Sequence, residues 1–173
     1  MLSFDIRALE TEAEQVDDDL PADDSVWEEG DGLPDGAVHV TGRLSAVGAN
    51  RYYFSGAFSG TLATECRRCL TATTVRVRDD AHFFYAEADT DEADDPDVYL
   101  IDPRDAQLDI RPAIRELWLL AAPAFALCRE DCQGLCPQCG VDRNTTDCGH
   151  RPAGSTDSRW DALRALEGDE SSH

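Results

Sequence analysis

The sequence predicts an α+β fold, an antiparallel β-meander or small open barrel with a packed helix and a C-terminal zinc-knuckle segment. Three observations carry this prediction. Apolar and polar residues alternate in consecutive stretches between residues 37 and 85, apolar residues recur at helical spacing between 109 and 122, and five of the seven cysteines fall between 128 and 150. We therefore expect a sheet domain over residues 1–127, a zinc-binding segment over 128–150, and a helix with a tail over 151–173.

Period-two alternation defines the expected strands. A short strand is expected at residues 2–9, and three longer ones at 37–48, 51–65 and 71–85. Short turns join the three longer strands, which is the pattern of an antiparallel meander. Their inward-facing residues are expected to be Val38, Val40, Leu44, Ala46, Tyr52, Phe54, Phe58, Leu62, Val75, Val77, Phe83 and Tyr85.

A helix is expected after two further short strands. Residues 98–101 and 107–110 read as strands, and the second is expected to extend the sheet. Asp109 then caps a helix over 109–122, and Pro123 ends it. One apolar stripe, expected to pack on the sheet, is formed by Ile110, Ala113, Ile114, Leu117, Trp118 and Ala121.

Two stretches are rich in Asp and Glu. Residues 10–36 and 86–97 are expected to be acidic loops, the first a flexible connector that Trp27 anchors. A short C-terminal helix is expected to start at Ser158 with a capping-box pattern.

Charge and hydropathy restrict the class of protein. The net charge is −21 and all fifteen basic residues are arginines, so the surface repels polyanions in general. One window differs: residues 41–78 hold six arginines against one glutamate, a local charge of +5. The longest apolar run, 117–122, is too short to cross a membrane, and no secretory signal is seen, so we expect a cytoplasmic protein without membrane contact.

The stretch from 128 to 150 is expected to bind one structural Zn²⁺. Its six candidate ligands are Cys128, Cys132, Cys136, Cys139, Cys148 and His150, and a tetrahedral zinc needs four. Cys136 and Cys139 are the surest pair, because two intervening residues let both sulfurs reach one ion and Gly140 permits a positive φ. Cys132 comes next, and either Cys128 or the Cys148–His150 end completes the set. The alternatives are unliganded reduced cysteines or a disulfide framework, which the odd cysteine count disfavours.

A second pair, Cys66 and Cys69, lies between two expected strands. Three interpretations of this pair remain open. It could join the 128–150 cluster in space, it could be a redox dithiol whose thiol pKa is lowered by Arg67 and Arg68, or it could form a tight turn with two unliganded thiols. Arginines gather around it. Arg76 and Arg78 leave the same face of one strand, and Arg67 and Arg68 lie beside them, so these four are the expected RNA contacts, against the alternative of an ordinary solvated face.

The motifs resemble those of the YceD-like family of large ribosomal RNA subunit (23S rRNA) accumulation proteins. The residues that carry the resemblance are Cys66-Arg-Arg-Cys69-Leu70, the run I-D-P-R-D-A-Q-L-D-I at 101–110, the helix with Leu117 and Leu120, Pro123, and Cys132-Gln-Gly-Leu-Cys136-Pro-Gln-Cys139-Gly140. Where family members often end the cluster in C-x-C, this chain has Cys148-Gly-His150. The resemblance implies a role in 23S rRNA accumulation and large-subunit assembly, with ribosomal RNA or an assembly intermediate as partner.

Enzyme classes find little support in the sequence. No Ser/His/Asp set, P-loop or paired carboxylate on a structured element is present, and no small-molecule substrate is indicated. The expected function is therefore a non-enzymatic ribosome-biogenesis factor. The alternatives are a zinc-stabilised adaptor that binds a basic ribosomal protein through acidic loops, or a CxxC redox protein.

Overall fold

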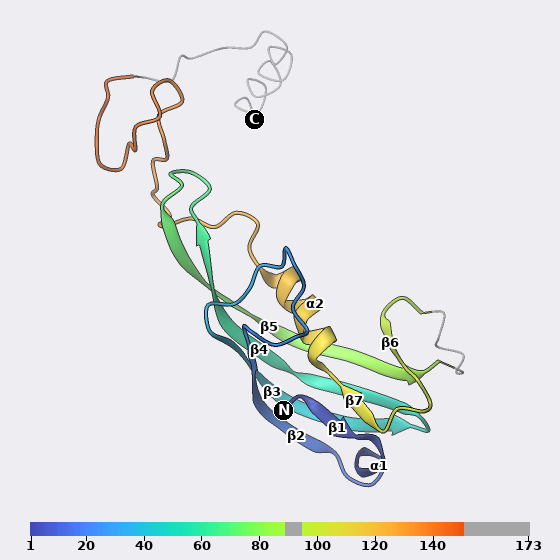
Figure 1. Ribbon diagram of the computed structural model, residues 1–173. Coiled ribbons are helices and arrows are strands. Elements are labelled where there is room, and N and C mark those ends of the chain that lie inside the picture. Colours follow the sequence, from blue (N-terminus) through green and yellow to red (C-terminus); the bar gives the residue numbers. More distant parts are fainter. Residues whose placement is uncertain (89–94, 151–173) are drawn as a thin grey trace, which may run out of the picture. The chain divides into compact units, whose positions relative to one another are not determined.

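The computed structural model describes residues 1–88 and 95–150 (Figure 1). The chain divides into two compact units, residues 1–132 and residues 133–173. The helix expected to start at Ser158 and the tail that follows it lie outside the described residues.

Within the described residues, the first unit is built on a five-stranded open sheet. Its strands, in spatial order, are β2 (Glu14–Pro21), β3 (Ala37–Gly48), β4 (Arg51–Glu65), β5 (Ala72–Glu87) and β6 (Val98–Ile101). The first four pair antiparallel, and β6 runs parallel to the end of β5. The predicted α+β class with an antiparallel sheet is confirmed, and the sheet does not close into a barrel.

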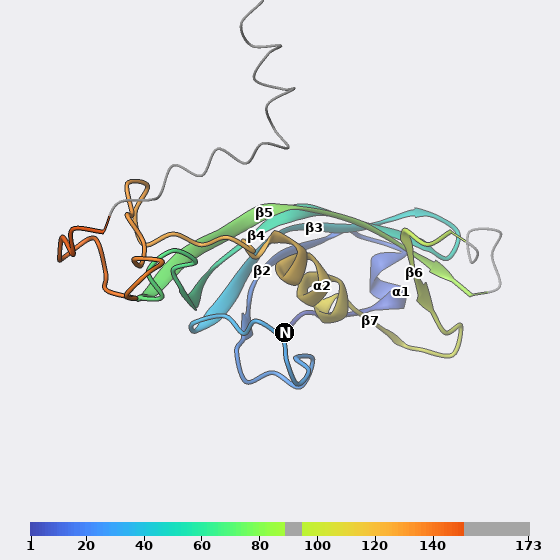
Figure 2. The same cartoon turned by 90° about the horizontal axis from the view of Figure 1, so that it is seen from above.

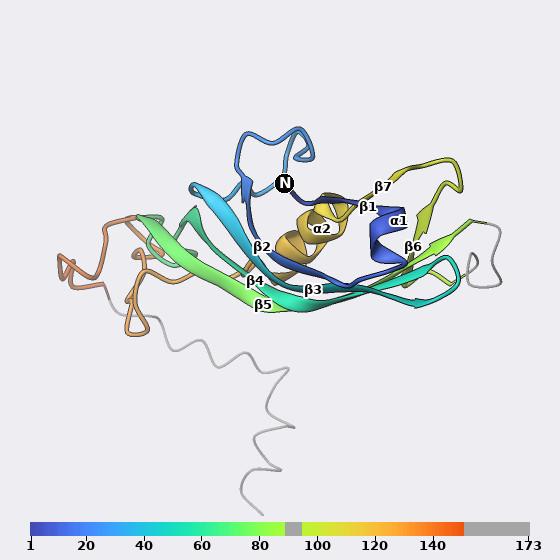
Figure 3. The same cartoon turned by 90° about the horizontal axis from the view of Figure 1, so that it is seen from below.

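The remaining elements of the first unit lie on one face of this sheet (Figures 2 and 3). They are α1 (Ile6–Leu9), α2 (Arg111–Ala121), and a two-stranded sheet of β1 (Ser3–Asp5) and β7 (Gln107–Asp109). The expected inward residues of the long strands are buried or half-buried on this side. The opposite face of β3, β4 and β5 carries no other element among the described residues.

Helix α2 sits close to the sheet because Gly60 of β4 leaves room for the ring of Trp118. Trp118 is fully buried, and its indole N–H donates to the carbonyl of Gly32 at 2.7 Å. A Cβ atom at Gly60 of β4 would lie 2.9 Å from the Trp118 ring. Gly42 and Gly56 face each other across β3 and β4 in the same way, and the ring of Phe54 fills the space that their side chains would occupy.

The acidic stretch 10–36 is not wholly the flexible connector that the sequence suggested. Residues 14–21 form β2, which pairs with β3 along its whole length. Val16 and Leu20 are buried, whereas Asp17 and Asp19 face solvent. The burial of alternate apolar residues therefore outweighs the unfavourable strand propensity of Asp.

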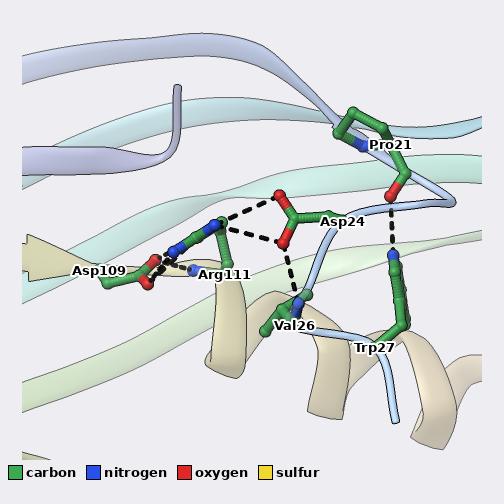
Figure 4. Close-up of polar contacts among 6 residues, drawn as sticks. All are labelled: Pro21, Asp24, Val26, Trp27, Asp109 and Arg111. Carbon is green, nitrogen blue, oxygen red and sulfur yellow. Dashed lines mark hydrogen bonds and ion pairs between the residues drawn. The ribbon is translucent and has the colours of Figure 1, made fainter. Parts of the chain in front are cut away.

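The loop between β2 and β3 is tied to α2 by ion pairs (Figure 4). Arg111 donates to the carboxylate of Asp109 at 2.7 Å and to that of Asp24 at 3.2 Å. Trp27 donates its indole N–H to the carbonyl of Pro21 at 2.7 Å, in keeping with its expected anchoring role. Arginine side chains on the helix thus hold an acidic loop that composition alone marks as mobile.

Two further expectations about short elements were wrong. The strand predicted at 2–9 stops at Asp5, whose carboxylate accepts the backbone N–H groups of Arg7 and Ala8 and so caps α1. Residues 107–110 were expected to extend the main sheet, but β7 pairs with β1 instead. The predicted helix is present over 111–121. Its N-cap is Ile110 and not the expected Asp109, although the carboxylate of Asp109 accepts the Arg111 N–H at the start of the helix.

Candidate metal centres

The first candidate metal centre lies within the first unit and joins two distant stretches of sequence. It consists of Cys66 and Cys69, in the turn between β4 and β5, with Cys128 and Cys132, which follow α2. The sulfurs of Cys66 and Cys132 are 3.7 Å apart, and those of Cys69 and Cys128 are 3.6 Å apart. All four sulfurs lie within 4.8 Å of one another.

These sulfur separations fit a tetrahedral thiolate site. With metal–sulfur bonds of about 2.3 Å, tetrahedral geometry places the sulfurs about 3.8 Å apart. A disulfide would need about 2.05 Å, and all seven cysteines are free. Soft thiolate ligands in a tetrahedron suit Zn²⁺ or iron, and do not suit Mg²⁺ or Ca²⁺.

Hydrogen bonds bring the two stretches of the first centre together. The backbone N–H of Arg67 donates to the carbonyl of Ala126 at 2.9 Å. The guanidinium of Arg68 donates to the carbonyl of Cys132 at 2.9 Å, and Arg67 stacks over the ring of Phe125 at 5.0 Å. Both arginines of the C-x-x-C turn therefore position the segment that carries the other two ligands.

The second candidate centre lies in the second unit. It contains Cys136, Cys139, Cys148 and His150, whose ligand atoms also lie within 4.8 Å of one another. The sulfur of Cys136 is 3.7 Å from Nδ1 of His150, close to the separation of about 3.6 Å expected for one sulfur and one nitrogen ligand of the same ion. A three-thiolate, one-imidazole set is a common structural zinc set.

The two C-x-x-C turns share one backbone geometry. In the first, Leu70 N–H donates to Cys66 O at 2.8 Å and Cys66 N–H to Thr71 O at 2.9 Å. In the second, Gly140 N–H donates to Cys136 O at 2.8 Å and Cys136 N–H to Val141 O at 2.8 Å. The residue after the second cysteine has a positive φ in both, 59° at Leu70 and 73° at Gly140.

Backbone N–H groups near the sulfurs favour the thiolate form of the leading cysteine of each C-x-x-C turn. The N–H of Cys128 is the main cause that lowers the pKa of Cys66 to about 6, and those of Gln138 and Cys139 lower the pKa of Cys136 to about 6. By contrast, desolvation raises the pKa of Cys128 to about 12. Four sulfurs this close cannot all ionise unless a cation offsets their charge, which is the condition that a metal ion satisfies.

Comparison with known proteins identifies the family. The model of the family described as "Large ribosomal RNA subunit accumulation protein YceD" matches residues 54–167. The chain belongs to this family. The match begins within β4 and covers all eight candidate metal ligands.

Relatives of this YceD-family chain include uncharacterized proteins of Mycobacterium tuberculosis and Mycobacterium bovis. Each is 36% identical over 119 residues, which is 65% of this chain and 56% of the relative. The chain thus spans little more than half the length of the curated relatives that it matches. No solved structure matches the chain.

Of the six ligand candidates in 128–150 of this YceD-family chain, four lie together around the expected Cys136–Cys139 pair, and the other two lie with Cys66 and Cys69. Cys128 and Cys132 lie with Cys66 and Cys69, whereas Cys136, Cys139, Cys148 and His150 form the other group. One signal in the sequence points to this division. The seven cysteines and His150 make eight ligands, enough for two complete tetrahedral sets.

The four arginines predicted to contact RNA fall into two environments. Arg67 and Arg68 make the contacts described above within the first centre. Arg76 and Arg78 are exposed on the uncovered face of β5, and neither lies in an ion pair with another described residue. Sequence analysis did not single out the hydroxyl side chains of Ser59 and Thr61, which face these two arginines across β4 and β5.

The structure bears on membrane contact in one respect. Among residues 1–88 and 95–150, no helix has the length and apolarity needed to span a bilayer.

Proposed function

We propose that this chain is a non-enzymatic factor for biogenesis of the large ribosomal subunit, which supports the accumulation and processing of 23S rRNA in the cytoplasm. The observation that carries the proposal is the YceD family match over residues 54–167. Each candidate centre offers four protein ligands, the number that a closed tetrahedral site uses. Such sites stabilise a fold and leave no position for a substrate, which favours a binding role over catalysis.

We further propose that each centre binds one Zn²⁺. The sulfur and nitrogen separations fit zinc, and the ligand sets are ones that structural zinc uses. At the first centre, the ion would be held by Cys66, Cys69, Cys128 and Cys132. Zinc there would link the β4–β5 turn to the segment after α2. In this proposal Cys66 and Cys69 are zinc ligands and not a redox pair.

Direct contact with ribosomal RNA is proposed at Arg76 and Arg78. These two arginines, with Ser59 and Thr61, line a shallow hollow of about 330 Å³ on the uncovered face of the sheet. Guanidinium groups and the hydroxyl of Ser59 are donors of the kind that bind phosphate oxygens, whereas the hydroxyl of Thr61 already donates to the carbonyl of Asp35 at 3.0 Å. Arg67 and Arg68 border the same hairpin, and their proposed part in RNA binding is secondary because both also contact the first centre.

A protein partner is the second candidate. The charge of −21 and the exposed acids of β2, Asp17 and Asp19, favour a basic ribosomal protein over a long stretch of RNA. In that case, the chain would act as an adaptor in an assembly intermediate. The two candidates differ in what co-purifies with the protein.

Depletion of the protein tests the proposed function. Sucrose-gradient profiles of depleted cells should show fewer large subunits, and RNA analysis should show less mature 23S rRNA, while small subunits are formed normally. Re-expression of the chain should restore both. Unchanged large-subunit peaks and 23S rRNA after depletion would refute the assignment, and recovery of a basic ribosomal protein without RNA would favour the adaptor.

A further inference from the structure

The uncovered face of the sheet carries a cluster of aromatic side chains that the core does not use. Tyr53 of β4 lies between His82 and Phe84 of β5. The ring centres of Tyr53 and Phe84 are 4.5 Å apart, and those of Tyr53 and His82 are 6.2 Å apart with the planes nearly parallel, at 15°. The Tyr53 hydroxyl lies 3.0 Å from Nδ1 of His82. We call Tyr53, His82 and Phe84 the aromatic cluster.

Burial separates this cluster from the core aromatics of the same strands. Tyr52, Phe54, Phe83 and Tyr85 alternate with it along β4 and β5, and each is at most 5% exposed. Phe84 is 45% exposed, and His82 is also exposed. No described element covers this face (Figures 2 and 3). The sheet therefore holds the aromatic cluster in place, with His82 and Phe84 exposed and Tyr53 half-buried between them.

Unpaired positive charge lies on the same face. Arg43 of β3 pairs in register with Ser55, which in turn pairs with His82, so Arg43 lies in the row next to that of Tyr53 and Phe84. Arg76 and Arg78 lie further along β5. In a chain with 36 acidic residues, these three arginines are in no ion pair within the part of the chain that the structure describes.

We propose that the aromatic cluster binds the bases of single-stranded RNA, while Arg43 and the Arg76–Arg78 pair bind its phosphates. The inference deepens the proposed function and rests on it. Aromatic rings stack on bases of any sequence, and arginines contact the backbone that links them. Double-stranded RNA offers no free base faces, so the cluster would distinguish single strands from duplexes.

Acidic residues set the path of the strand. Asp80 lies on the same face of β5 between His82 and Arg78, and it would repel a phosphate chain that followed β5. On the other side, Asp17 and Asp19 of β2 contact His39 and keep that edge negative. The open route runs over β4, where the outward side chains of Ser55, Ala57 and Ser59 are small. Tyr53 and Ser59 are six residues apart on β4, about 20 Å in an extended strand, so several nucleotides fit between the cluster and the arginine pair.

The test is the binding of labelled eight-nucleotide oligoribonucleotides to the full chain, measured by fluorescence anisotropy. Oligouridylate and oligoadenylate serve as single strands and a blunt-ended RNA duplex without a loop as the double strand. Phe84→Leu and Tyr53→Leu should each weaken single-strand binding about tenfold, which corresponds to about 1.4 kcal/mol for one stacked base. Tyr53→Phe keeps the ring and should bind within twofold of wild type.

Leu33→Ala is the matched control, because Leu33 is 47% exposed and lies in the loop between β2 and β3, away from this face. It should leave RNA binding unchanged. Thermal melting of each variant shows whether it is folded. Cross-linking of 4-thiouridine RNA to the wild-type chain gives an independent readout, with adducts expected on peptides that contain Tyr53, His82 or Phe84.

Three results would overturn the proposal: equal binding by wild type and both leucine variants, equal affinity for the blunt-ended duplex and single strands, or leucine variants that lose only a co-purifying ribosomal protein. Each leaves the proposed function standing, since the depletion experiment uses none of these variants. Conversely, an unchanged subunit profile on depletion refutes the proposed function whatever the oligonucleotides do.

Discussion

The sulfur atoms of Cys66 and Cys132 lie 3.7 Å apart, although the two residues are 66 positions apart in the sequence. A metal ion held there would close a long loop that contains β5, β6, β7 and α2. Cross-links over long loops restrict the unfolded chain most, so this ion is expected to stabilise the first unit as a whole. The second centre spans only residues 136–150, and its ion is expected to hold a short segment folded.

The first prediction concerns metal stoichiometry. Protein purified without added metal should contain two zinc ions per chain by elemental analysis. Cys66→Ser and Cys136→Ser should each lower the content to one, because each removes a ligand from a different set of four. His150→Ala should also lower the zinc content, because His150 is a ligand of the second set. His39→Ala is its matched control: it removes an exposed imidazole that is not a ligand, and it should leave the content at two. A wild-type content of one ion, or of none, would contradict the two-centre proposal.

The second prediction uses the difference between the two C-x-x-C turns. Leu70 has a φ of 59° in a turn where the equivalent residue is Gly140. A left-handed conformation costs a non-glycine residue about 1–2 kcal/mol, and Leu70 is 58% exposed, so that its truncation removes little packing. Leu70→Gly should therefore leave unfolding free energy unchanged or raise it by up to about 1 kcal/mol. Gly140→Leu should weaken zinc retention at the second centre. Thermal melting measures the stability of Leu70→Gly, and competition with a chelator measures zinc retention by Gly140→Leu. A strong decrease in the stability of Leu70→Gly would show that the turn is not strained.

Much of the fold follows from side-chain periodicity. The period-two alternation from Val38 to Tyr85 predicts the central strands closely, because one face of each is buried and the other is not. The stripe from Ile110 to Trp118 predicts α2 for the same reason. The strand β2 is missed because most of its solvent-facing positions are acidic, so that composition hides the two buried residues, Val16 and Leu20.

The ligand types of the candidate centres also follow from the sequence, but their partition does not. Spacing links Cys136 to Cys139 and Cys66 to Cys69 because two intervening residues make a tight turn. Nothing in the spacing shows that Cys128 and Cys132 face the β4–β5 turn, since that depends on where α2 ends over the sheet. The aromatic cluster is missed for a similar reason, because alternation shows which residues share a face but not which face remains uncovered.

The third prediction concerns the contact between Gly60 and Trp118. A methyl group at Gly60 would lie 2.9 Å from one ring carbon of Trp118 and 3.2 Å from the carbonyl of Ala37. Gly60→Ala should lower the free energy of unfolding by about 1–3 kcal/mol, as overpacking in a core does. Gly32→Ala is the control, because its methyl group would make only an ordinary contact, 3.8 Å from Leu62. Urea denaturation measures both, and equal midpoints would show that α2 is free to shift.

The fourth prediction concerns the ion pair between Arg115 of α2 and Asp31 of the loop between β2 and β3. The guanidinium donates two hydrogen bonds to the carboxylate, at 2.7 and 3.0 Å, and this contact holds the pKa of Asp31 below its ordinary value of 3.8. Because the folded-state pKa is lowered, the stabilisation is present above about pH 4 and is lost as the pH falls through the folded pKa. Asp31→Asn should therefore lower the stability at neutral pH and flatten its decline in acid.

The control for the fourth prediction is the exposed pair of Arg104 and Asp102. Asp102→Asn should have little effect on stability at neutral pH, since ion pairs in solvent contribute little. Hydrogen exchange of residues 22–36 gives a local readout, and exchange should rise in Asp31→Asn and not in Asp102→Asn. Unchanged exchange in Asp31→Asn would mean that the other contacts of the loop, such as those of Arg111 and Trp118, hold it without this ion pair.

The fifth prediction concerns the salt dependence of RNA binding. Arg76→Ala combined with Arg78→Ala should weaken binding of a single-stranded oligoribonucleotide. The slope of log affinity against log salt should fall by about 1.4, because each phosphate that is no longer neutralised removes about 0.7 from the slope. The fold should be unaffected, since both side chains are exposed. Arg104→Ala combined with Arg129→Ala removes the same charge from exposed positions elsewhere and should leave the slope unchanged. If the two double variants lower the slope equally, the effect is one of net charge, and Arg76 and Arg78 do not contact the RNA.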